Sequence, residues 1–534
     1  MASFKKISKK ATAILIAVIT VFSVTSSAFF KVDAANRSNI PVVYVWGMGQ
    51  ENLYNDIGTE NEKMIYPMQD TMEYLTAAAK ENLSVFAKAF FTQKWDEFCD
   101  VLCKVITDMC SDMKLEKNGE PRENSGIKWD WPQNPLPDRK RWGTYWIYDY
   151  TFRYDWRRSP VLVADTLNEY INDVCRATGQ KKVALVGRCL GTAIVSSYLT
   201  KYGGDRVSEC IMYVGTANGA LICSKAFCGE IKIDADGINR YVNDITLSET
   251  DYIDEFLKAS IDLMEKTYKL DIAAWAVNNV YNKIYLNINP RTLRDSYGTF
   301  PSYWSMVSDN DYEKAKDVVF YGADRSEYEG LIEKTDDYHE NVQVPLSETL
   351  SSLEKDGVKF AVIAKYGKQM TPVTSENNVI SDEMVKLSEA SFGAVTSEVD
   401  ETLSEEYLKA AEENGTIKYI SPDKKVDAST CLFRDSTWII KDIDHNKFPA
   451  CIDELMYEFI NSNGELTVNN NERFPQYLVF DEEKGTFSPM NSENCSTSEE
   501  RWNRSWFEDY KAVFKGIFTL IKNYFTDLFK KNKE

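Results

Sequence analysis

The stretch Val183-Ala-Leu-Val-Gly-Arg-Cys-Leu-Gly-Thr192 decides the fold of this chain. Its first four residues are an uninterrupted apolar run, which indicates a strand that is buried on both faces. The next five residues, Gly187 to Gly191, place a glycine on either side of a central Arg-Cys-Leu. From Thr192 to about Tyr202 the apolar spacing becomes helical. The stretch therefore predicts a buried strand that turns sharply into a helix, with Cys189 at the turn.

Strand-like runs alternate with helical patterns on both sides of this turn. Apolar runs recur at 40–45, 145–152, 207–214 and 358–364, and helical spacing covers 66–113 and 160–178. Because strands that alternate with helices form parallel sheets, we predict an α/β fold with a mostly parallel central sheet flanked by helices. The aromatic-rich residues from about 220 to 350 lie between two of these strands, so we expect them to form an inserted cap.

Composition limits the class of protein. The chain has 534 residues, of which 43% are hydrophobic, enough for one large core with insertions. Its formal net charge is −20. A chain with no basic excess cannot neutralise phosphates, so we expect no nucleic-acid partner.

The first 35 residues predict a signal peptide. Four lysines between Lys5 and Lys10 precede the apolar run Ala11 to Val24, and small residues follow at Val32-Asp-Ala34. A retained membrane anchor is the alternative, although the apolar run is shorter than the roughly 20 residues that span a bilayer. We therefore expect the mature protein to be secreted and extracellular.

The cysteines and histidines do not predict a metal site. Eleven cysteines are an odd number, so at least one thiol is free or bonded to another chain. Cys99, Cys103 and Cys110 have helical spacing, which favours buried side chains over a local disulfide. With only two histidines and no Cys-x-x-Cys pair, we expect neither a metal ion nor another cofactor.

Gly187-x-Cys189-x-Gly191, between a strand and a helix, has the form of a nucleophile elbow. Glycine is needed at the flanking positions because the turn is tight. The start of the following helix, like a neighbouring imidazole, would favour the thiolate of Cys189. The alternative is an ordinary turn with an incidental cysteine.

A cysteine nucleophile needs a base, and the chain has two histidines. His339 lies in the polar stretch 334–341, which predicts an exposed loop. His445 follows the strand-like run Thr437–Ile440 and precedes the helical run Phe448–Ile460. His445 is therefore the predicted base, with a purely structural histidine as the alternative.

The acid of such a site lies between the nucleophile and the histidine in chain order. Asp423, which follows Pro422, is the predicted acid. Asp427 is the second candidate and Asp382 the third. A turn-forming role after the proline is the alternative for Asp423.

Tyr154-Asp155-Trp156-Arg157, ahead of the elbow, resembles the lecithin–cholesterol acyltransferase family of lipase-like α/β-hydrolases. Weaker similarities occur at 41–48, 214–219, 366–372 and 423–426. The family has the α/β-hydrolase fold, so the resemblance implies that fold here.

The resemblance also implies roles for individual residues. Cys189 would be the nucleophile, His445 the base and then acid, and Asp423 the group that orients the histidine. The backbone N–H groups of Leu190 and Met48 would form the oxyanion hole. The implied protein is an exported hydrolase or acyltransferase for lipid-like acyl esters.

The cysteine departs from the family, which has serine at this position. A thiolate favours activated acyl donors, and polyhydroxyalkanoate synthases also carry a Gly-x-Cys-x-Gly elbow. A thioesterase or polyester-synthase-like enzyme is therefore an alternative. A non-catalytic protein that binds lipid or a surface is another.

The pattern changes after the predicted catalytic domain, 36–487. A polar linker is expected at 488–500 and an amphipathic helix at 501–534. The helix has aromatic residues on one face and lysines on the other, a pattern that suits contact with a membrane surface. Packing of this helix on the catalytic domain is the alternative.

Overall fold

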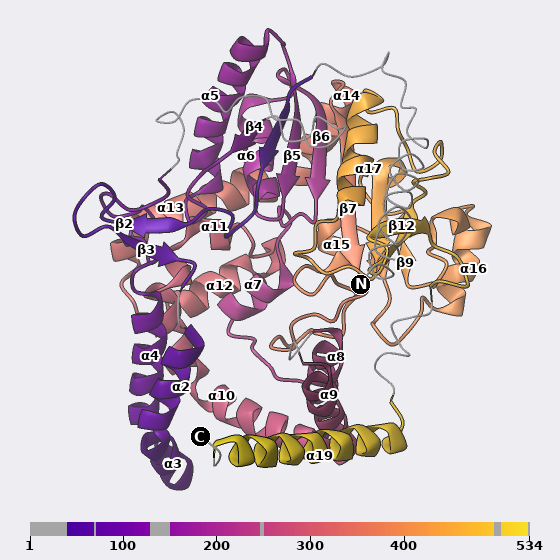
Figure 1. Cartoon of the computed structure of the whole chain (residues 1–534). Helices are drawn as coiled ribbons and strands as arrows, with labels where there is room; N and C mark the ends of the chain where they lie inside the picture. The colour runs from indigo at the N-terminus through magenta and orange to yellow at the C-terminus, as the bar shows by residue number, and fades with distance from the viewer. Residues whose placement is uncertain (1–39, 69–70, 129–149, 246–249, 496–503, 532–534) are drawn as a thin grey trace, which may run out of the picture. The chain divides into compact units, whose positions relative to one another are not determined.

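An eight-stranded sheet forms the centre of the fold in the computed structural model, which describes residues 40–68, 71–128, 150–245, 250–495 and 504–531. Its strands are β1 (Val42–Val45), β4 (Tyr150–Phe152), β5 (Val183–Arg188), β6 (Val207–Tyr213), β7 (Lys359–Tyr366), β10 (Thr437–Lys441), β11 (Tyr477–Asp481) and β12 (Thr486–Pro489). They lie in the order β12-β11-β10-β7-β6-β5-β1-β4 (Figure 1). Every neighbouring pair is parallel except β11 and β12. The predicted mostly parallel sheet is confirmed.

Helices and two small two-stranded sheets complete the described residues. The main helices are α2 (Thr71–Glu81), α3 (Leu83–Thr92), α4 (Asp96–Cys110), α5 (Pro160–Thr178), α6 (Gly191–Tyr202), α7 (Leu221–Phe227), α8 (Ala235–Asp244), α9 (Asp251–Lys266), α10 (Lys269–Arg294), α11 (Pro301–Trp304), α12 (Tyr312–Val319), α13 (Glu329–Tyr338), α14 (Leu346–Lys355), α15 (Leu387–Ala390), α16 (Glu405–Glu413), α17 (Ala450–Asn461) and α19 (Trp506–Lys531). The small sheets pair β2 (Leu53–Asn55) with β3 (Lys63–Tyr66), and β8 (Val395–Thr396) with β9 (Val426–Asp427). The predicted signal peptide, 1–35, lies outside the described residues.

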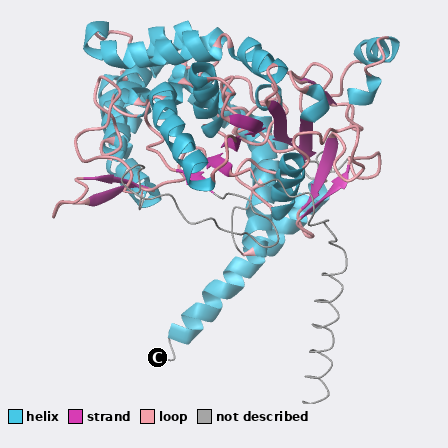
Figure 2. Ribbon diagram, turned by 90° about the horizontal axis from the view of Figure 1, so that it is seen from above, coloured by secondary structure: helices cyan, strands magenta, loops and turns pink. Residues whose placement is uncertain are grey.

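Both faces of the sheet are covered, which explains why its strands read as continuous apolar runs. In β1, Val43 and Val45 belong to the core under α5, α6 and α14, whereas Val42 and Tyr44 belong to the core under α17. Figure 2 shows helices on both sides of the row of strands. The two cores hold the carboxyl ends of the parallel strands at one edge, where the candidate site lies.

Local signals set the ends of α5 where the sequence predicts them. Pro160 occupies the first turn, where its missing N–H is not needed. Gly179 ends the helix in the left-handed conformation that glycine tolerates, with φ of 71°. The tight connection from β5 to α6 likewise matches the prediction.

The chain between β6 and β7 is mostly helical. Its longest helix, α10, packs against α4 through Ile284 and Ile288. Cys99 and Cys103 of α4 are buried in this contact, and Cys110 is buried at the end of the same helix. All three are free thiols, as the helical spacing predicts.

The carboxyl-terminal region differs from the expected linker. Residues 488 and 489 belong to β12, and Met490 and Cys495 are buried against the core. Part of the predicted polar linker therefore belongs to the fold, because Ser488 and Pro489 pair with β11. After the undescribed residues 496–503, α19 packs along α9. None of the described helices is long and apolar enough to cross a membrane.

Candidate active site

The turn after β5 holds Cys189 in a strained backbone conformation. Its φ is 51°, in the left-handed region that non-glycine residues rarely adopt. A Cβ added at Gly191 would lie 2.1 Å from the carbonyl oxygen of Val45, and one at Gly187 would lie 3.1 Å from Thr192 Cα. The two glycines are therefore required by close backbone approach, as expected for a nucleophile elbow.

The loop after β1 lies directly against this turn. A Cβ added at Gly47 would lie 2.8 Å from Cys189 Cβ, so glycine allows the loop to approach. Half-buried Met48 follows in the chain. On the other side, the backbone N–H of Leu190 donates a hydrogen bond to the Cys189 sulfur. Both predicted oxyanion-hole residues therefore belong to the segments that border Cys189.

His445 lies in the loop between β10 and α17 and is 2% exposed. Its imidazole shares a hydrogen bond with the Cys189 thiol. Its Nδ1 lies 2.7 Å from Oδ2 of Asp382, which is fully buried. The backbone N–H of Val385 donates to the other Asp382 oxygen at 2.8 Å. Thiol, imidazole and carboxylate thus form a continuous hydrogen-bonded row.

The structure corrects the predicted acid. Asp423 is held elsewhere, by the Tyr366 hydroxyl at 2.8 Å and Lys441 Nζ at 3.0 Å. Asp427, the second candidate, accepts a hydrogen bond from the Tyr407 hydroxyl at 2.8 Å. Asp382 contacts His445 because it follows β7, the direct neighbour of β10 in the sheet. The third candidate from the sequence therefore occupies the acid position.

The electrostatics of the row favour charge separation. Burial opposes ionisation of Cys189, but His445, Arg188 and the Leu190 N–H together lower the pKa of the thiol. Burial also opposes protonation of His445, yet Asp382 and Cys189 raise the pKa of the imidazole to about 10. The arrangement therefore supports a thiolate beside an imidazolium.

Tyr154-Asp155-Trp156-Arg157 forms hydrogen bonds with the loop after β1. The Tyr154 hydroxyl donates to the carbonyl of Trp46 at 2.6 Å, and the Trp156 indole donates to the carbonyl of Glu51 at 3.3 Å. Arg157, which is fully buried, pairs with Asp155 and donates to the Met113 carbonyl. The motif therefore holds the loop after β1 against the elbow.

Cys223 lies close to Cys189. Burial, followed by the charge of Cys189, raises the pKa of Cys223 to about 12. Of the eleven cysteines, only these two are partly exposed. Cys223 belongs to a set of partly buried side chains that pack against the core on one face of the sheet: Met48, Tyr66, Met68, Cys223, Tyr297 and Tyr303.

His339 takes no part in the row, although the predicted exposed loop around it is wrong. It begins the π-helical turn η5 (His339–Gln343), and its Nδ1 lies 3.0 Å from Gln343 Oε1. Its ring stacks on Tyr312 at 3.9 Å between centroids. The polar sequence did not reveal this packing, because one face of the helix is buried by a residue distant in the chain.

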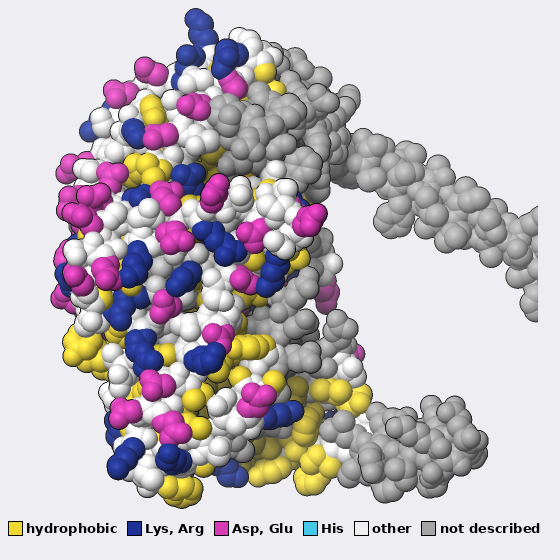
Figure 3. All heavy atoms as spheres, turned by 90° about the vertical axis from the view of Figure 1, so that its left-hand side faces the viewer, with side chains coloured by type: hydrophobic (Ala, Val, Ile, Leu, Met, Phe, Trp, Pro, Cys, Tyr) yellow, Lys and Arg dark blue, Asp and Glu magenta, His cyan; other side chains and the backbone are white. Residues whose placement is uncertain are grey.

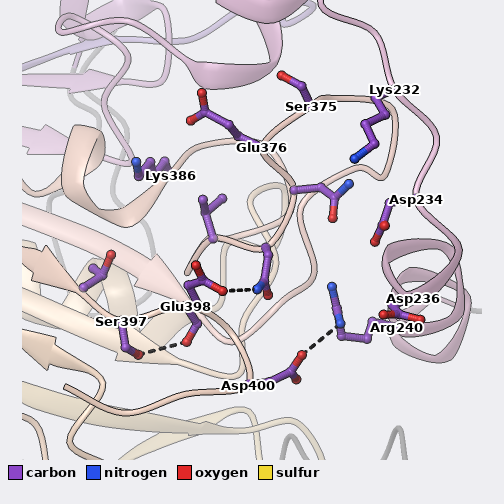
Figure 4. A pocket seen from close by; sticks show the side chains of 14 residues that line it. Lys232, Asp234, Asp236, Arg240, Ser375, Glu376, Lys386, Ser397, Glu398 and Asp400 are labelled. Atoms are coloured by element: carbon purple, nitrogen blue, oxygen red, sulfur yellow. Dashed lines mark hydrogen bonds and ion pairs between the residues drawn. The ribbon is translucent and has the colours of Figure 1, made fainter. Parts of the chain in front are cut away.

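A charged cleft of about 550 Å³ lies beside the segment that carries Asp382 (Figure 4). It is lined from both α8 and residues 375–379. Arg240 of α8 donates to Gln369 at 2.7 Å and pairs with Asp400 at 3.0 Å. These bonds tie the inserted helices to the acid-bearing segment. Within the described residues, no cluster of three His, Cys, Asp or Glu side chains could hold a metal ion.

The comparison with protein families agrees with this architecture. A family model described as the alpha/beta hydrolase fold matches residues 130–226, which include α5 and the elbow. A search of curated proteins found no match. Among solved structures, the crystal structure of the Tle4–Tli4 complex is similar at 14% identity, with a TM-score of 0.17. That match covers 35% of this chain and 48% of that chain, about half its length. From its sheet, its elbow and the matching family model, we conclude that this chain has the α/β-hydrolase fold.

Proposed function

We propose that this chain is an exported acyl-ester hydrolase or acyltransferase that acts on lipid-like substrates through Cys189, His445 and Asp382. The fold supports hydrolytic or acyl-transfer chemistry. The observation that carries the proposal is the row of hydrogen bonds from thiol to imidazole to carboxylate at a strained elbow. Export rests on the lysine-rich, apolar start of the sequence.

In the proposed first step the Cys189 thiolate attacks the carbonyl carbon of the ester. The backbone N–H groups of Leu190 and Met48 donate to the oxyanion of the tetrahedral intermediate. The C–O bond then breaks, the leaving alkoxide takes a proton from His445, and an acyl thioester remains on Cys189. Asp382 stabilises the imidazolium and fixes the orientation of its ring.

In the second step a water molecule or an alcohol enters. His445, now neutral, removes its proton while its oxygen attacks the thioester carbonyl. The second tetrahedral intermediate expels the thiolate, which restores the Cys189–His445 ion pair. Water gives a free acid, whereas an alcohol gives a new ester, so access of water decides between hydrolysis and transfer.

Cysteine makes proton donation in the first step critical. A thiolate leaves more readily than an alkoxide, so the intermediate returns to substrate unless His445 protonates the alkoxide. The raised pKa of His445 keeps that proton available. Thioesters need less help, so a thioesterase or polyester-synthase-like enzyme is the alternative. Partly buried Met48, next to the elbow, and Cys223, near Cys189, suit an acyl chain as substrate in either case.

The test is turnover of p-nitrophenyl esters and matching acyl thioesters by the mature protein under reducing conditions. Cys189→Ala should abolish turnover, and Cys223→Ala, a nearby partly exposed thiol, is the matched control. Preference for thioesters would favour the alternative enzyme class. If neither substrate class is turned over and no acyl group is found on Cys189 by mass spectrometry, the enzymatic proposal fails and a lipid-binding role is the remaining reading.

We also propose that α19 contacts a lipid bilayer surface. The helix packs on α9 through its small and polar side: Asp509 pairs with Lys266, and Gly516 lies against Phe256. Its large aromatic side chains point outward, with Phe507 78%, Phe514 68% and Phe518 71% exposed. Such exposure is unfavourable in water and suits an interface with lipid, where aromatic rings are favoured.

A second apolar area supports the same surface. Figure 3 shows hydrophobic side chains gathered at the lower end of the molecule, and both α3 and α19 lie at that end in Figure 1. Phe91 of α3 is 83% exposed. Packing on α9 and contact with a membrane are therefore compatible, because they use opposite sides of α19.

Co-sedimentation with phosphatidylcholine vesicles tests this contact. Changing Phe507, Phe514 and Phe518 together to Ser should release the protein from vesicles, whereas Tyr321→Ser, at an exposed aromatic outside α19, should not. Light scattering without lipid provides the other arm. A dimer that disappears in the triple variant, with no vesicle binding by the wild type, would assign the face to a second copy and overturn the proposal.

A further inference from the structure

Two buried basic side chains, Lys365 and Arg188, form hydrogen bonds with the backbone of the loop that carries His445. Lys365 of β7 donates from Nζ to the carbonyl oxygens of Asp444 at 3.0 Å, His445 at 3.3 Å and Lys447 at 2.5 Å. Arg188, inside the elbow, donates to the carbonyl oxygen of His445 at 3.3 Å. One side chain from each of the strands on either side of β6 thus holds the same short stretch of backbone.

Both cations are buried without a carboxylate partner. Lys365 is 1% exposed and Arg188 is 6% exposed. Within the described part of the chain, neither forms an ion pair; each is placed over aromatic rings, Lys365 over Tyr213 and Arg188 over Trp46. Burial of an unpaired charge is costly, and apolar residues could fill the same space more cheaply. Their retention calls for a role other than packing.

Both cations also act electrostatically on the groups that flank the imidazole. Burial raises the pKa of the Cys189 thiol. His445 and, to a smaller extent, Arg188 lower it. Lys365 makes a smaller contribution to the lowered pKa of Asp382. Each cation therefore acts on one of the two ends of the hydrogen-bonded row, and both hold its centre through the backbone.

The charged and titratable groups that face Lys365 come from every surrounding element. They are Arg188 of the elbow, Asp382 of the acid-bearing segment, Asp444 of the histidine loop, Cys451 of α17 and Tyr213 of β6. Burial and Arg188 lower the pKa of Lys365 to about 7, although Asp382 acts in the opposite direction. The charge of the Lys365 side chain therefore changes near neutral pH.

We propose that Arg188 and Lys365 are positioning residues that lock the histidine loop and keep the two anions beside His445 ionised. The inference rests on the proposed nucleophilic role of Cys189. Neither side chain needs to contact substrate, because both act through the loop and through charge.

The test measures Cys189 alkylation by iodoacetamide against pH, by mass spectrometry, together with kcat and KM on the best ester or thioester. Lys365→Met and Arg188→Met should each shift the alkylation midpoint upward and slow alkylation at pH 7 about tenfold. KM should stay within about twofold while kcat falls, because ground-state binding is untouched. Lys182→Met is the matched control, since Lys182 also donates to a backbone carbonyl, but at the opposite end of β5.

A conservative variant separates the effect of the Arg188 charge from the effect of its hydrogen bonds to the histidine loop. Arg188→Lys keeps the charge but cannot reproduce the planar contacts, so its alkylation midpoint should stay close to that of the wild type while kcat falls. This variant also serves if the methionine variants fail to fold. An unchanged alkylation midpoint in folded Lys365→Met, together with an unchanged kcat in both Lys365→Met and Arg188→Lys, would overturn the inference. A wild-type Cys189 that reacts no faster than an ordinary thiol would instead overturn the proposed function.

Discussion

Two buried aspartates lie near the same edge of the sheet and have different partners. Asp382 contacts the His445 imidazole at 2.7 Å, and Asp423 contacts the Lys441 ammonium at 3.0 Å. In both cases burial opposes ionisation and the neighbouring base lowers the pKa of the carboxyl. The chemistry of the carboxylate is therefore similar, and the partner decides what it can do. An imidazole can accept and donate a proton during acyl transfer, whereas Lys441 forms a buried ion pair with its carboxylate.

The comparison teaches that local sequence was a poor guide to role. Asp423 follows a proline in a short turn and looked like the acid. The sheet order nevertheless places β7 beside β10, so the segment after β7 meets the loop after β10. Asp382 reaches His445 by this route. Asp423 instead fills the space between Tyr366 and Lys441, where it compensates a buried ammonium.

The largest expected effect is on catalysis. Asp382→Asn should lower kcat by about 10³- to 10⁴-fold, because an amide neither stabilises the imidazolium nor selects its tautomer. Asp423→Asn should change kcat by less than about tenfold, since it lacks contact with the row. Steady-state kinetics on the best ester or thioester, at a temperature where both variants are folded, measure the difference. Equal losses in the two variants would erase the proposed distinction.

The next largest expected effect is on stability, and it follows from replacing Asp423. Asp423→Leu should reduce the free energy of unfolding by about 3–5 kcal/mol, because it leaves the buried Lys441 unpaired. Adding Lys441→Met should recover most of the loss. Urea denaturation followed by circular dichroism measures both. A single variant as stable as the wild type would show that the Asp423–Lys441 pair contributes little.

The pH dependence of this pair has a defined sign. The folded pKa of Asp423 is lowered, because Lys441 and hydrogen bonds from Ser421 and Tyr366 outweigh burial. Its contribution to stability is therefore present above the unfolded pKa, about 3.9, and is lost as the pH falls through the lower folded pKa. Urea midpoints between pH 6 and pH 3 should fall less steeply in the Asp423→Leu/Lys441→Met variant than in the wild type.

The smallest expected effect is on the thiol. Removing the Asp382 charge should lower the pKa of His445 and so raise that of Cys189, by about one unit. Iodoacetamide alkylation at pH 7 should then slow about tenfold in Asp382→Asn and remain unchanged in Asp423→Asn. If Asp423→Asn produced the larger shift, the assignment of the two aspartates would be reversed.

The elbow and the base were accessible from the sequence for physical reasons. The two glycines around Cys189 are visible as a local pattern, although the close approach that Gly191 allows is to Val45 of β1. His445 could be singled out because the chain has only two histidines and one of them follows a strand. By contrast, the packing of His339 on Tyr312 depends on a contact between residues of different helices.

Arg188 and Lys365 illustrate the same limit. Arg188 lies inside the elbow motif, residues 187–191. These five residues do not reveal that its guanidinium forms a hydrogen bond with the backbone of the histidine loop. Lys365 interrupts an apolar strand, which is a weak signal that a buried charge has a partner. Only the order of the strands in the sheet, β10-β7-β6-β5, shows that the partner of Lys365 is the backbone of the histidine loop.

The sequence by itself determined the alternation of strands and helices, the strained turn at Cys189 and the position of His445. These features follow from periodicity, glycine requirements and chain order, which act over a few residues. The tertiary structure alone decided that Asp382 lies beside His445, that Lys365 and Arg188 hold the histidine loop, and that Phe507, Phe514 and Phe518 of α19 face outward. Each of these depends on which strands and helices become neighbours, and that choice is made by burial of the whole core.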